Sequence, residues 1–344
     1  MVVPIFLPHS GCGQRCIYCH QGYITDIGVG DLKTRIDSAL KGRREACEVG
    51  LFGGNIFGIE PASLEGLFSL FAEHRNVISG FRLSTKPVPL VDETIDILKR
   101  NGVDLIELGI PTFNDAILAA VNRDHTAQDL YCAYERLGGE GFRLALQFMV
   151  GLPGETMSDI ERTVEDMVRL RPEYIRIYPL VILRNTPLYG LYERGDFKPI
   201  SFDDALERAC FIYVNALRHD IDVANVGLTD NEMVSGMVAG GFYHPAYGLL
   251  VQSRIFRGAL ETALGKLTCP KEVTVTLHKN DIPLLVGHRR ENLRWFSTLG
   301  IALRWDPSGT ERGAFELVSG RERVKGRATG RRRKEANGQS TRSE

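Results

Sequence analysis

The first 180 residues alternate between short apolar runs and segments with helical periodicity. Between the runs, apolar residues recur at three- and four-residue intervals, as from Leu64 to Phe71, and this spacing predicts amphipathic helices. The six runs have the length and composition of strands and are Val2–Leu7, Cys47–Phe52, Phe81–Ser84, Leu105–Ile110, Leu144–Val150 and Tyr174–Pro179. Six strand–helix units predict an α/β fold with a parallel sheet, arranged as a partial TIM-like (β/α)6 barrel, because a complete barrel needs eight units.

The regular alternation weakens after residue 180, which indicates a second domain. A helix over residues 202–218 and strands over 222–228 and 272–277 are still expected there. We therefore predict a partial barrel in residues 1–180 and a smaller C-terminal α/β extension in residues 181–320. Apolar residues almost vanish after residue 320, and basic residues occupy positions 331–334 without interruption, so residues 321–344 are predicted to form a disordered basic tail.

Composition and charge exclude several classes of protein. The chain has 344 residues, of which 43% are hydrophobic and 25% charged, so a large core is expected and a collagen-like or wholly disordered chain is excluded. The formal net charge is −1, but the charge is unevenly distributed. Residues 321–344 hold nine Lys and Arg and only three Glu, so the rest of the chain is acidic. No run approaches the roughly 18 apolar residues of a membrane-spanning helix, and no secretory signal is recognisable.

Seven cysteines are present, and four of them stand far apart in the sequence, at positions 47, 132, 210 and 269. An odd number of mostly isolated cysteines argues against a disulfide framework. It indicates a reducing compartment, so we expect a cytoplasmic protein without a membrane partner.

The other three cysteines are clustered. Cys12, Cys16 and Cys19 follow the first predicted strand at spacings of four and three residues, and thiolate ligands favour zinc or an iron–sulfur cluster. A structural zinc site normally has four ligands, for which His9 and His20 are the available candidates. Three thiolates on a 4Fe-4S cluster would instead leave one iron open to a cofactor. We favour the open-iron cluster, with zinc or a chance grouping as alternatives.

The Cys-x3-Cys-x2-Cys spacing, with Tyr18 before the last cysteine, resembles the signature of the radical S-adenosylmethionine (SAM) superfamily. Two further segments match in the same order along the chain. Residues 51–55 resemble the Gly-Gly-Glu segment whose backbone receives the methionyl amino group of SAM, and residues 82–87 resemble the third-strand segment that approaches this cofactor. The resemblance implies a 4Fe-4S cluster and SAM as cofactors.

Later segments resemble one subgroup of this superfamily more closely. Residues 107–113, 121–126 and 147–156 are similar to the subgroup that contains the Elongator catalytic subunit and oxygen-independent coproporphyrinogen oxidase. Residues 176–180, 186–189 and 240–245 are similar to its Elongator-like branch. The resemblance covers residues 3 to about 255, and residues 256–344 are not assigned.

The resemblance implies a set of cofactor-binding residues, whereas no catalytic acid or base is assigned. Arg123 would pair with the methionyl carboxylate, although a surface ion pair is the alternative, and Gln147 would approach the ribose. Glu107 stands among apolar neighbours, so it should either face the barrel mouth or pair with an arginine. The complete set is Tyr18, Gly53, Gly54, Asn55, Ser84, Thr85, Glu107, Arg123 and Gln147.

Some positions depart from the family pattern. Pro111 stands where the related enzymes commonly have Gln, Asn55 replaces the usual Glu, Ser or Thr, and Asp124 replaces a common Gly. Because the cysteines and Arg123 are present, SAM binding should persist. His125 is interpreted as a structural residue at the start of a helix. The remaining aromatic candidates are interpreted as packing residues, with contact to substrate as the alternative, and are Tyr178, Tyr189, Tyr243 and His244.

The family activity implied by the resemblance is reductive cleavage of SAM to a deoxyadenosyl radical that abstracts a substrate hydrogen, with an external electron donor. Modification of a tRNA wobble uridine is the first substrate hypothesis, with phosphate contacts from the basic tail. Elongator subunits also carry an acetyltransferase domain, which the residues after 255 are too few to form. A small-molecule or peptide substrate and a non-catalytic metal-binding relative are the alternatives.

Overall fold

The computed structural model describes residues 1–20, 31–88, 90–228 and 232–328. The chain divides into two compact units. The first comprises Met1–Ala216 and Ile221–Val251, and the second comprises Leu217–Asp220 and the residues from Gln252 onward.

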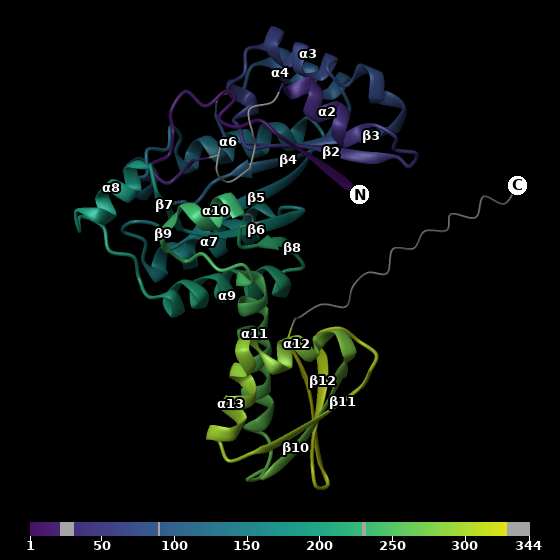
Figure 1. Cartoon of the computed structure of the whole chain (residues 1–344), viewed down its shortest axis with the longest axis vertical. Helices are drawn as coiled ribbons and strands as arrows, with labels where there is room; N and C mark the ends of the chain where they lie inside the picture. The colour runs from purple at the N-terminus through teal and green to yellow at the C-terminus, as the bar shows by residue number, and fades with distance from the viewer. Residues whose placement is uncertain (21–30, 89, 229–231, 329–344) are drawn as a thin grey trace, which may run out of the picture. The chain divides into compact units, whose positions relative to one another are not determined.

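A parallel sheet of seven strands forms the centre of the first unit (Figure 1). Its strands are β1 (Val2–Phe6), β2 (Cys47–Phe52), β3 (Ile78–Thr85), β4 (Val103–Gly109), β5 (Arg143–Val150), β6 (Tyr174–Pro179) and β8 (Asp222–Val226). They lie in the order β1-β2-β3-β4-β5-β6-β8, and every neighbouring pair is parallel. The curled sheet has edges at β1 and β8, so the expected partial TIM-like barrel is confirmed.

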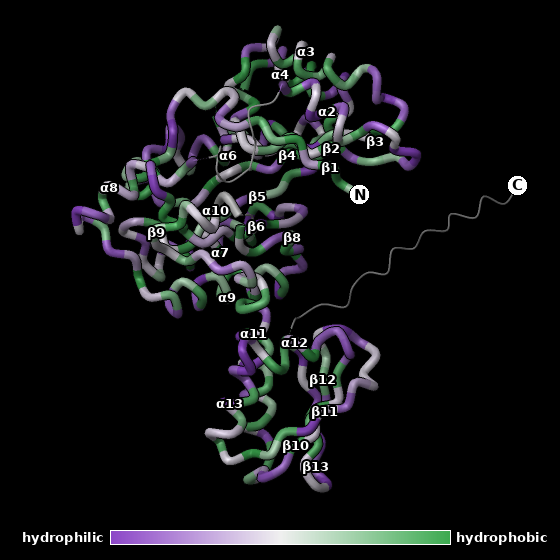
Figure 2. The backbone as a smooth tube through the Cα atoms, in the orientation of Figure 1, coloured by the Kyte–Doolittle hydropathy of each residue, from purple (hydrophilic) through white to green (hydrophobic). Residues whose placement is uncertain are grey.

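The central strands are largely buried because helices cover the outer face of the sheet. Figure 2 shows hydrophobic stretches along the central strands, where Leu51, Leu83, Leu105 and Leu146 are completely buried. The helices of this unit are α2 (Leu32–Leu40), α3 (Pro61–Ser69), α4 (Asp92–Arg100), α5 (Asp115–Ala120), α6 (Ala127–Gly139), α7 (Met157–Leu170), α8 (Pro187–Glu193), α9 (Phe202–Arg218) and α10 (Glu232–Met237). Two 3-10 helices, η1 (Ile56–Gly58) and η2 (Ala72–Val77), complete the connections.

After β6 the chain adds one more strand to this sheet, so the boundary between the two units lies later in the sequence than predicted. Strand β8 pairs with β6, whereas the sequence analysis assigned its residues to the C-terminal extension. A short antiparallel pair, β7 (Val181–Leu183) and β9 (Val238–Gly241), also belongs to the first unit. The structural division therefore lies near residue 251 instead of residue 180, and the sheet has seven strands instead of six.

The second unit is a four-stranded sheet with its own hydrophobic core. Its strands lie in the order β11 (Ala302–Gly309), β10 (Glu272–His278), β12 (Ala314–Ser319) and β13 (Glu322–Arg327). The other elements are the residues of α11 (Tyr247–Leu264) from Gln252 onward, η3 (Lys279–Asp281), α12 (Ile282–Val286), η4 (His288–Arg290) and α13 (Glu291–Thr298). Phe256, Val275, Phe296 and Leu317 are buried in this core.

Strand β13 lies within the segment that was predicted to be a disordered tail. It pairs antiparallel with β12 over six positions, and Val324 packs against the hydrophobic core. A polar strand is stable at a sheet edge because its free backbone groups face water. The prediction of disorder was therefore wrong for residues 322–327, and residues 329–344 lie outside the described residues.

The longest described helices are α9 and α11, with 17 and 18 residues. Arg254, Arg257 and Glu261 place charges within α11. Over the described part of the chain, no helix combines the length and hydrophobicity needed to cross a membrane.

Candidate functional site

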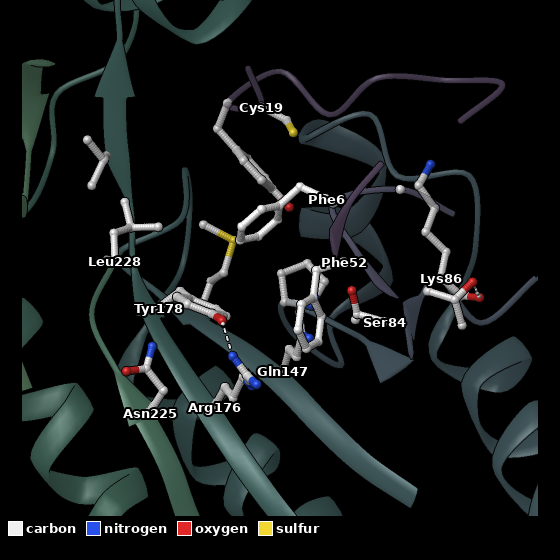
Figure 3. Close-up of a pocket in the computed structure, with 18 of the residues that line it drawn as sticks. Phe6, Cys19, Phe52, Ser84, Lys86, Gln147, Arg176, Tyr178, Asn225 and Leu228 are labelled. Carbon is white, nitrogen blue, oxygen red and sulfur yellow. Dashed lines mark hydrogen bonds between the residues drawn. The ribbon is translucent and has the colours of Figure 1, made fainter. Parts of the chain in front are cut away.

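A cavity of about 800 Å³ opens at the carboxyl ends of the parallel strands. Figure 3 shows Ser84 and Lys86 on one side of it and Tyr178, Asn225 and Leu228 on the other. All seven strands contribute, with Phe6 from β1, Phe52 from β2, Ser84 and Thr85 from β3, Gly109 from β4, Gln147 and Met149 from β5, Arg176 and Tyr178 from β6, and Ala224 and Asn225 from β8. This is the end of a barrel at which sites form.

The cysteine loop forms one wall of this cavity. Cys12 and Cys19 line the cavity together with Tyr18, whereas Cys16 is buried behind them. Burial, with the neighbouring Cys16 and Cys12, raises the pKa of Cys19 to about 12. Thiols that disfavour each other's ionisation are suited to a cationic metal group, because metal binding deprotonates them and compensates the charge. Three thiols are therefore the donor chemistry of an iron–sulfur cluster, although among the described residues no three His, Cys, Asp or Glu side chains lie close enough to hold a single metal ion.

The turn after α5 holds the cysteine loop in place. Asn122 donates its side-chain amide to the carbonyl of Arg15 at 2.8 Å, and the backbone N–H of Ile17 donates to the carbonyl of Val121 at 3.1 Å. Arg123 donates through Nη1 to Cys16 Sγ at 3.4 Å. The predicted Arg123 thus lies between a cysteine and the cavity.

Arg123 also forms a hydrogen bond to the barrel sheet. Its Nη2 donates to the carbonyl of Gly109 at the end of β4. Two bonds from one guanidinium fix its orientation, so the part that lines the cavity is presented in a defined position.

The Gly53-Gly54 turn lies against the loop that precedes the cysteines. Gly53 has a φ of +87°, a region that favours glycine. A Cβ atom on Gly54 would lie 2.7 Å from the carbonyl oxygen of Ser10 and 2.9 Å from that of Leu7. Both glycines line the cavity, and the close approach explains why the second position has no side chain.

Asn55, for which the sequence predicts a contact to the cofactor, is not among the residues that line the cavity. Its Oδ1 accepts hydrogen bonds from Thr85 Oγ1 at 2.8 Å and from the backbone N–H of Lys86 at 3.2 Å. Its Nδ2 donates to the carbonyl of Gly11 at 3.2 Å. The Asn55 side chain thus connects three loops, whereas Ser84 and Thr85 line the cavity.

Glu107 is also behind the cavity wall. The side chain is completely buried, and it pairs with Arg176, whose Nε lies 2.9 Å from Glu107 Oε2. Tyr174 donates its hydroxyl to Glu107 Oε1 at 2.5 Å, and Gln147 donates through Nε2 to Oε2 at 2.7 Å. Of the two expectations for Glu107, the ion pair with an arginine is confirmed. The same carboxylate fixes the orientation of Gln147 and Arg176.

A second ion pair continues this network toward the bottom of the barrel. Arg82 donates to Glu48 at 2.5 Å and to the hydroxyl of Tyr174 at 3.2 Å. Burial and the adjacent Glu107 hold the pKa of Tyr174 above its usual value, so its hydroxyl remains a donor. The charges of Arg176 and Arg82 are therefore each compensated by a glutamate, Glu107 and Glu48 respectively, within the barrel.

Four polar residues of the cavity lining were not in the predicted site and are Lys86, Arg176, Tyr178 and Asn225. Tyr178 was interpreted as a packing residue, but it lines the cavity and accepts a hydrogen bond from Arg176 Nη1 at 3.4 Å. One signal was present in the sequence, because Tyr174, Arg176 and Tyr178 alternate along one strand and so share a face.

The end of the cavity near β8 is largely apolar. Met149, Val181, Leu183 and Leu228 line it, with Asn225 as a polar neighbour. Asn225 Nδ2 donates to the carbonyl of Gly227 at 2.8 Å. The cavity therefore has a polar end with cysteines and glycines and an apolar end that offers few polar groups.

Two family models match the chain. The model described as the radical SAM superfamily matches residues 6–167, and the model described as the radical SAM C-terminal domain matches residues 172–257. Together they cover the first unit and end near its boundary with the second.

Several curated proteins are similar over this region. The heme chaperone HemW of Lactococcus lactis is 28% identical over 67% of this chain and 66% of its own length, and that of Bacillus subtilis is 32% identical over 54% and 52%. The tRNA uridine(34) acetyltransferase of Methanocaldococcus jannaschii is 28% identical over 44% of this chain and 28% of its own length. The chain therefore spans less than two thirds of the length of each of these relatives.

Two solved structures share the fold. Elp3 of Methanocaldococcus infernus with an N-terminal deletion has a TM-score of 0.60 at 17% identity, covering 75% of this chain and 63% of that one. Coproporphyrinogen III oxidase (HemN) of Escherichia coli has a TM-score of 0.51 at 16% identity, covering 63% and 52%.

Proposed function

Because the chain belongs to the radical SAM superfamily, whose enzymes use a 4Fe-4S cluster and SAM, we propose that it cleaves SAM reductively in the cavity of the first unit. Together these cofactors supply a one-electron cleavage of SAM to methionine and a 5′-deoxyadenosyl radical that takes a hydrogen atom from the substrate. The electron comes from an external donor. The observation that carries the proposal is that Cys12 and Cys19 line the same cavity as the Gly53-Gly54 turn.

The residues of the polar end would bind and orient the cofactors. Cys12, Cys16 and Cys19 would hold the cluster. Arg123 is available to pair with the methionyl carboxylate of SAM, and its fixed guanidinium beside Cys16 supports this role. Gln147 is oriented by its hydrogen bond to Glu107, which supports a contact to the ribose.

The apolar end of the cavity would take the reacting part of the substrate and exclude water from it. Tyr178 and Asn225 are the polar groups available there. A tRNA wobble uridine is our first substrate hypothesis, supported by the similarity to a protein named as a tRNA uridine(34) acetyltransferase. Nine basic residues in positions 321–344 could contribute phosphate contacts.

We place the enzyme in the cytoplasm. All seven cysteines are free, which agrees with a reducing compartment. A strong reductant of that compartment would serve as the electron donor.

The direct test is deoxyadenosine release from SAM by protein reconstituted with iron and sulfide without oxygen, measured with and without bulk tRNA under a strong reductant. Cys16→Ala should abolish release, whereas Cys132→Ala should not, because Cys132 is exposed on α6 and outside the cluster. Release by the Cys16→Ala protein would overturn the proposal.

The same assay separates the substrate hypotheses. Release that tRNA stimulates supports an RNA substrate, and release indifferent to tRNA favours a small molecule or peptide. Absence of release from protein with full iron loading supports the non-catalytic alternative, and binding of one zinc without iron supports a zinc site.

A further inference from the structure

Lys86 is a buried cation at the wall of the cavity. The residue is only 5% exposed, and its Nζ lies 2.9 and 3.0 Å from the two carboxylate oxygens of Asp124 and 3.1 Å from the carbonyl oxygen of Gln14. An ammonium group has three protons to donate, and these three acceptors account for them. The ammonium group of Lys86 is therefore fully hydrogen-bonded within the chain, and this suits a structural role.

The structure that it holds is the cysteine loop. Gln14 lies between Cys12 and Cys16, and the following residues are fastened by the turn that carries Asp124. Asn122 binds the carbonyl of Arg15, Arg123 binds Cys16 Sγ, and Val121 binds the N–H of Ile17. Four consecutive loop residues, 14 to 17, thus each receive one contact from Lys86 or from residues 121–123.

The pair also places charge beside the thiols. The Nζ of Lys86 contacts the carbonyl of Gln14, which lies between Cys12 and Cys16, so a positive charge is held next to the cysteine loop. The carboxylate of Asp124 binds the same Nζ and places a negative charge there, which acts against that of Lys86 on a neighbouring anion. Any negatively charged group held by these cysteines would experience the same two opposing charges.

We propose that Lys86 and Asp124 form a positioning pair that fixes the cysteine loop and sets the reduction potential of the cluster held there. The inference rests on the proposed function, since it takes a 4Fe-4S cluster as the group bound by the cysteines. Reduction adds one electron from the external donor, so a nearby positive charge favours the reduced cluster and a negative charge opposes it. Neither residue contacts the reacting atoms.

The test uses charge changes of opposite sign. Lys86→Met leaves Asp124 uncompensated and should shift the midpoint potential of the reconstituted protein downward. Asp124→Asn leaves Lys86 uncompensated and should shift it upward, whereas Lys86→Arg keeps the charge and should stay close to the wild-type value. The potential is read from a redox titration followed by electron paramagnetic resonance, with iron and sulfide counted per chain.

Opposite shifts distinguish an electrostatic role from structural damage, which would move both variants in one direction. Lys99→Met is the matched control, because Lys99 pairs with Glu140 on the exposed surface and its loss should leave potential and iron content unchanged. Lower iron content in Lys86→Met than in Lys99→Met, at an equal unfolding temperature, supports the positioning role.

Equal potentials and equal iron contents in wild type, Lys86→Met and Asp124→Asn would overturn this proposal alone. Failure of the wild type to bind a cluster would instead overturn the proposed function. If Lys86→Met does not fold, Asp124→Asn carries the test, since an unchanged or lowered potential contradicts the proposal and a raised one supports it.

Discussion

Glu107 supports Gln147 from beneath the cavity, with Glu107 Oε2 accepting a hydrogen bond from Gln147 Nε2 at 2.7 Å. The same carboxylate binds Arg176 and the hydroxyl of Tyr174, so one buried charge orients three side chains from two neighbouring strands. These strands are adjacent in the sheet, with Gln147 of β5 in register with Arg176 of β6. This part of the cavity wall is thus held by contacts within the chain itself.

Glu107→Gln should destabilise the protein by about 3 kcal/mol, because it leaves the partly buried Arg176 without its counter-charge. The measurement is urea denaturation of the cluster-free protein. Glu65→Gln is the control, since Glu65 and Arg100 are 45% and 54% exposed and their pair should contribute less than about 1 kcal/mol. Equal losses in the two variants would contradict the role given to Glu107.

Asn55→Ala should lower stability more than it lowers SAM affinity. The substitution leaves the buried Thr85 hydroxyl and the Lys86 N–H without their acceptor, a loss of about 1–3 kcal/mol. Urea denaturation of the cluster-free protein gives the first quantity, and equilibrium binding of SAM to the reconstituted protein gives the second. Unchanged stability with weakened SAM binding would restore Asn55 to the direct cofactor contacts that the sequence indicated.

Local sequence was sufficient for those parts of the site that one segment forms by itself. Cys12, Cys16 and Cys19 follow a strand at fixed spacing, and Gly53-Gly54 ends another strand, so both could be placed from the sequence. The six predicted strands also occur as β1 to β6, because each run is mainly apolar and has the length of a strand.

Residues whose role depends on strand pairing could not be found in this way. The contacts of Glu107 come from β5 and β6, and nothing near Glu107 in the sequence shows which arginine meets it. Lys86 was likewise missed, because its partners Gln14 and Asp124 are 72 and 38 positions away. Strand β8 belongs to the barrel sheet because it pairs with β6. A helical segment lies between these two strands in the sequence and interrupts the regular alternation, so the pairing could not be predicted.

Gly54→Ala should impair both folding and iron loading. The added methyl group would meet the carbonyl oxygens of Ser10 and Leu7 at 2.7 and 2.9 Å, and backbone atoms cannot move away without shifting the loop that leads to Cys12. We expect a loss of at least about 1 kcal/mol and a reduced iron content after reconstitution. Urea denaturation and iron analysis give the two quantities.

Gly66→Ala is the matched control for this substitution. Gly66 lies inside α3, and a Cβ atom there would have open space around it. Because alanine favours a helix interior, the control should gain about 0.5–1 kcal/mol and keep its iron. A Gly54→Ala protein that resembles this control in both measurements would show that the turn tolerates a side chain.

His125 should make the protein less stable in mild acid. Its side chain is 1% exposed, neither ring nitrogen has a hydrogen-bond partner among the described residues, and Nδ1 lies 3.7 Å from Asp124 Oδ1. Burial, together with the charge of Arg123, lowers the pKa of His125 from 6.5 to about 3. Below pH 6.5 the unfolded chain therefore binds a proton that the folded protein does not, and stability falls with pH through this window.

The corresponding variant is His125→Leu, which removes the titrating group and keeps an apolar side chain in the same space. Between pH 7.5 and pH 5 the wild type should lose about 2 kcal/mol more of its unfolding free energy than the variant does. Urea denaturation of both cluster-free proteins at the two pH values measures this difference. The same loss in both proteins would mean that His125 is protonated in the folded state, and hence that the charge of Asp124 outweighs burial at this position.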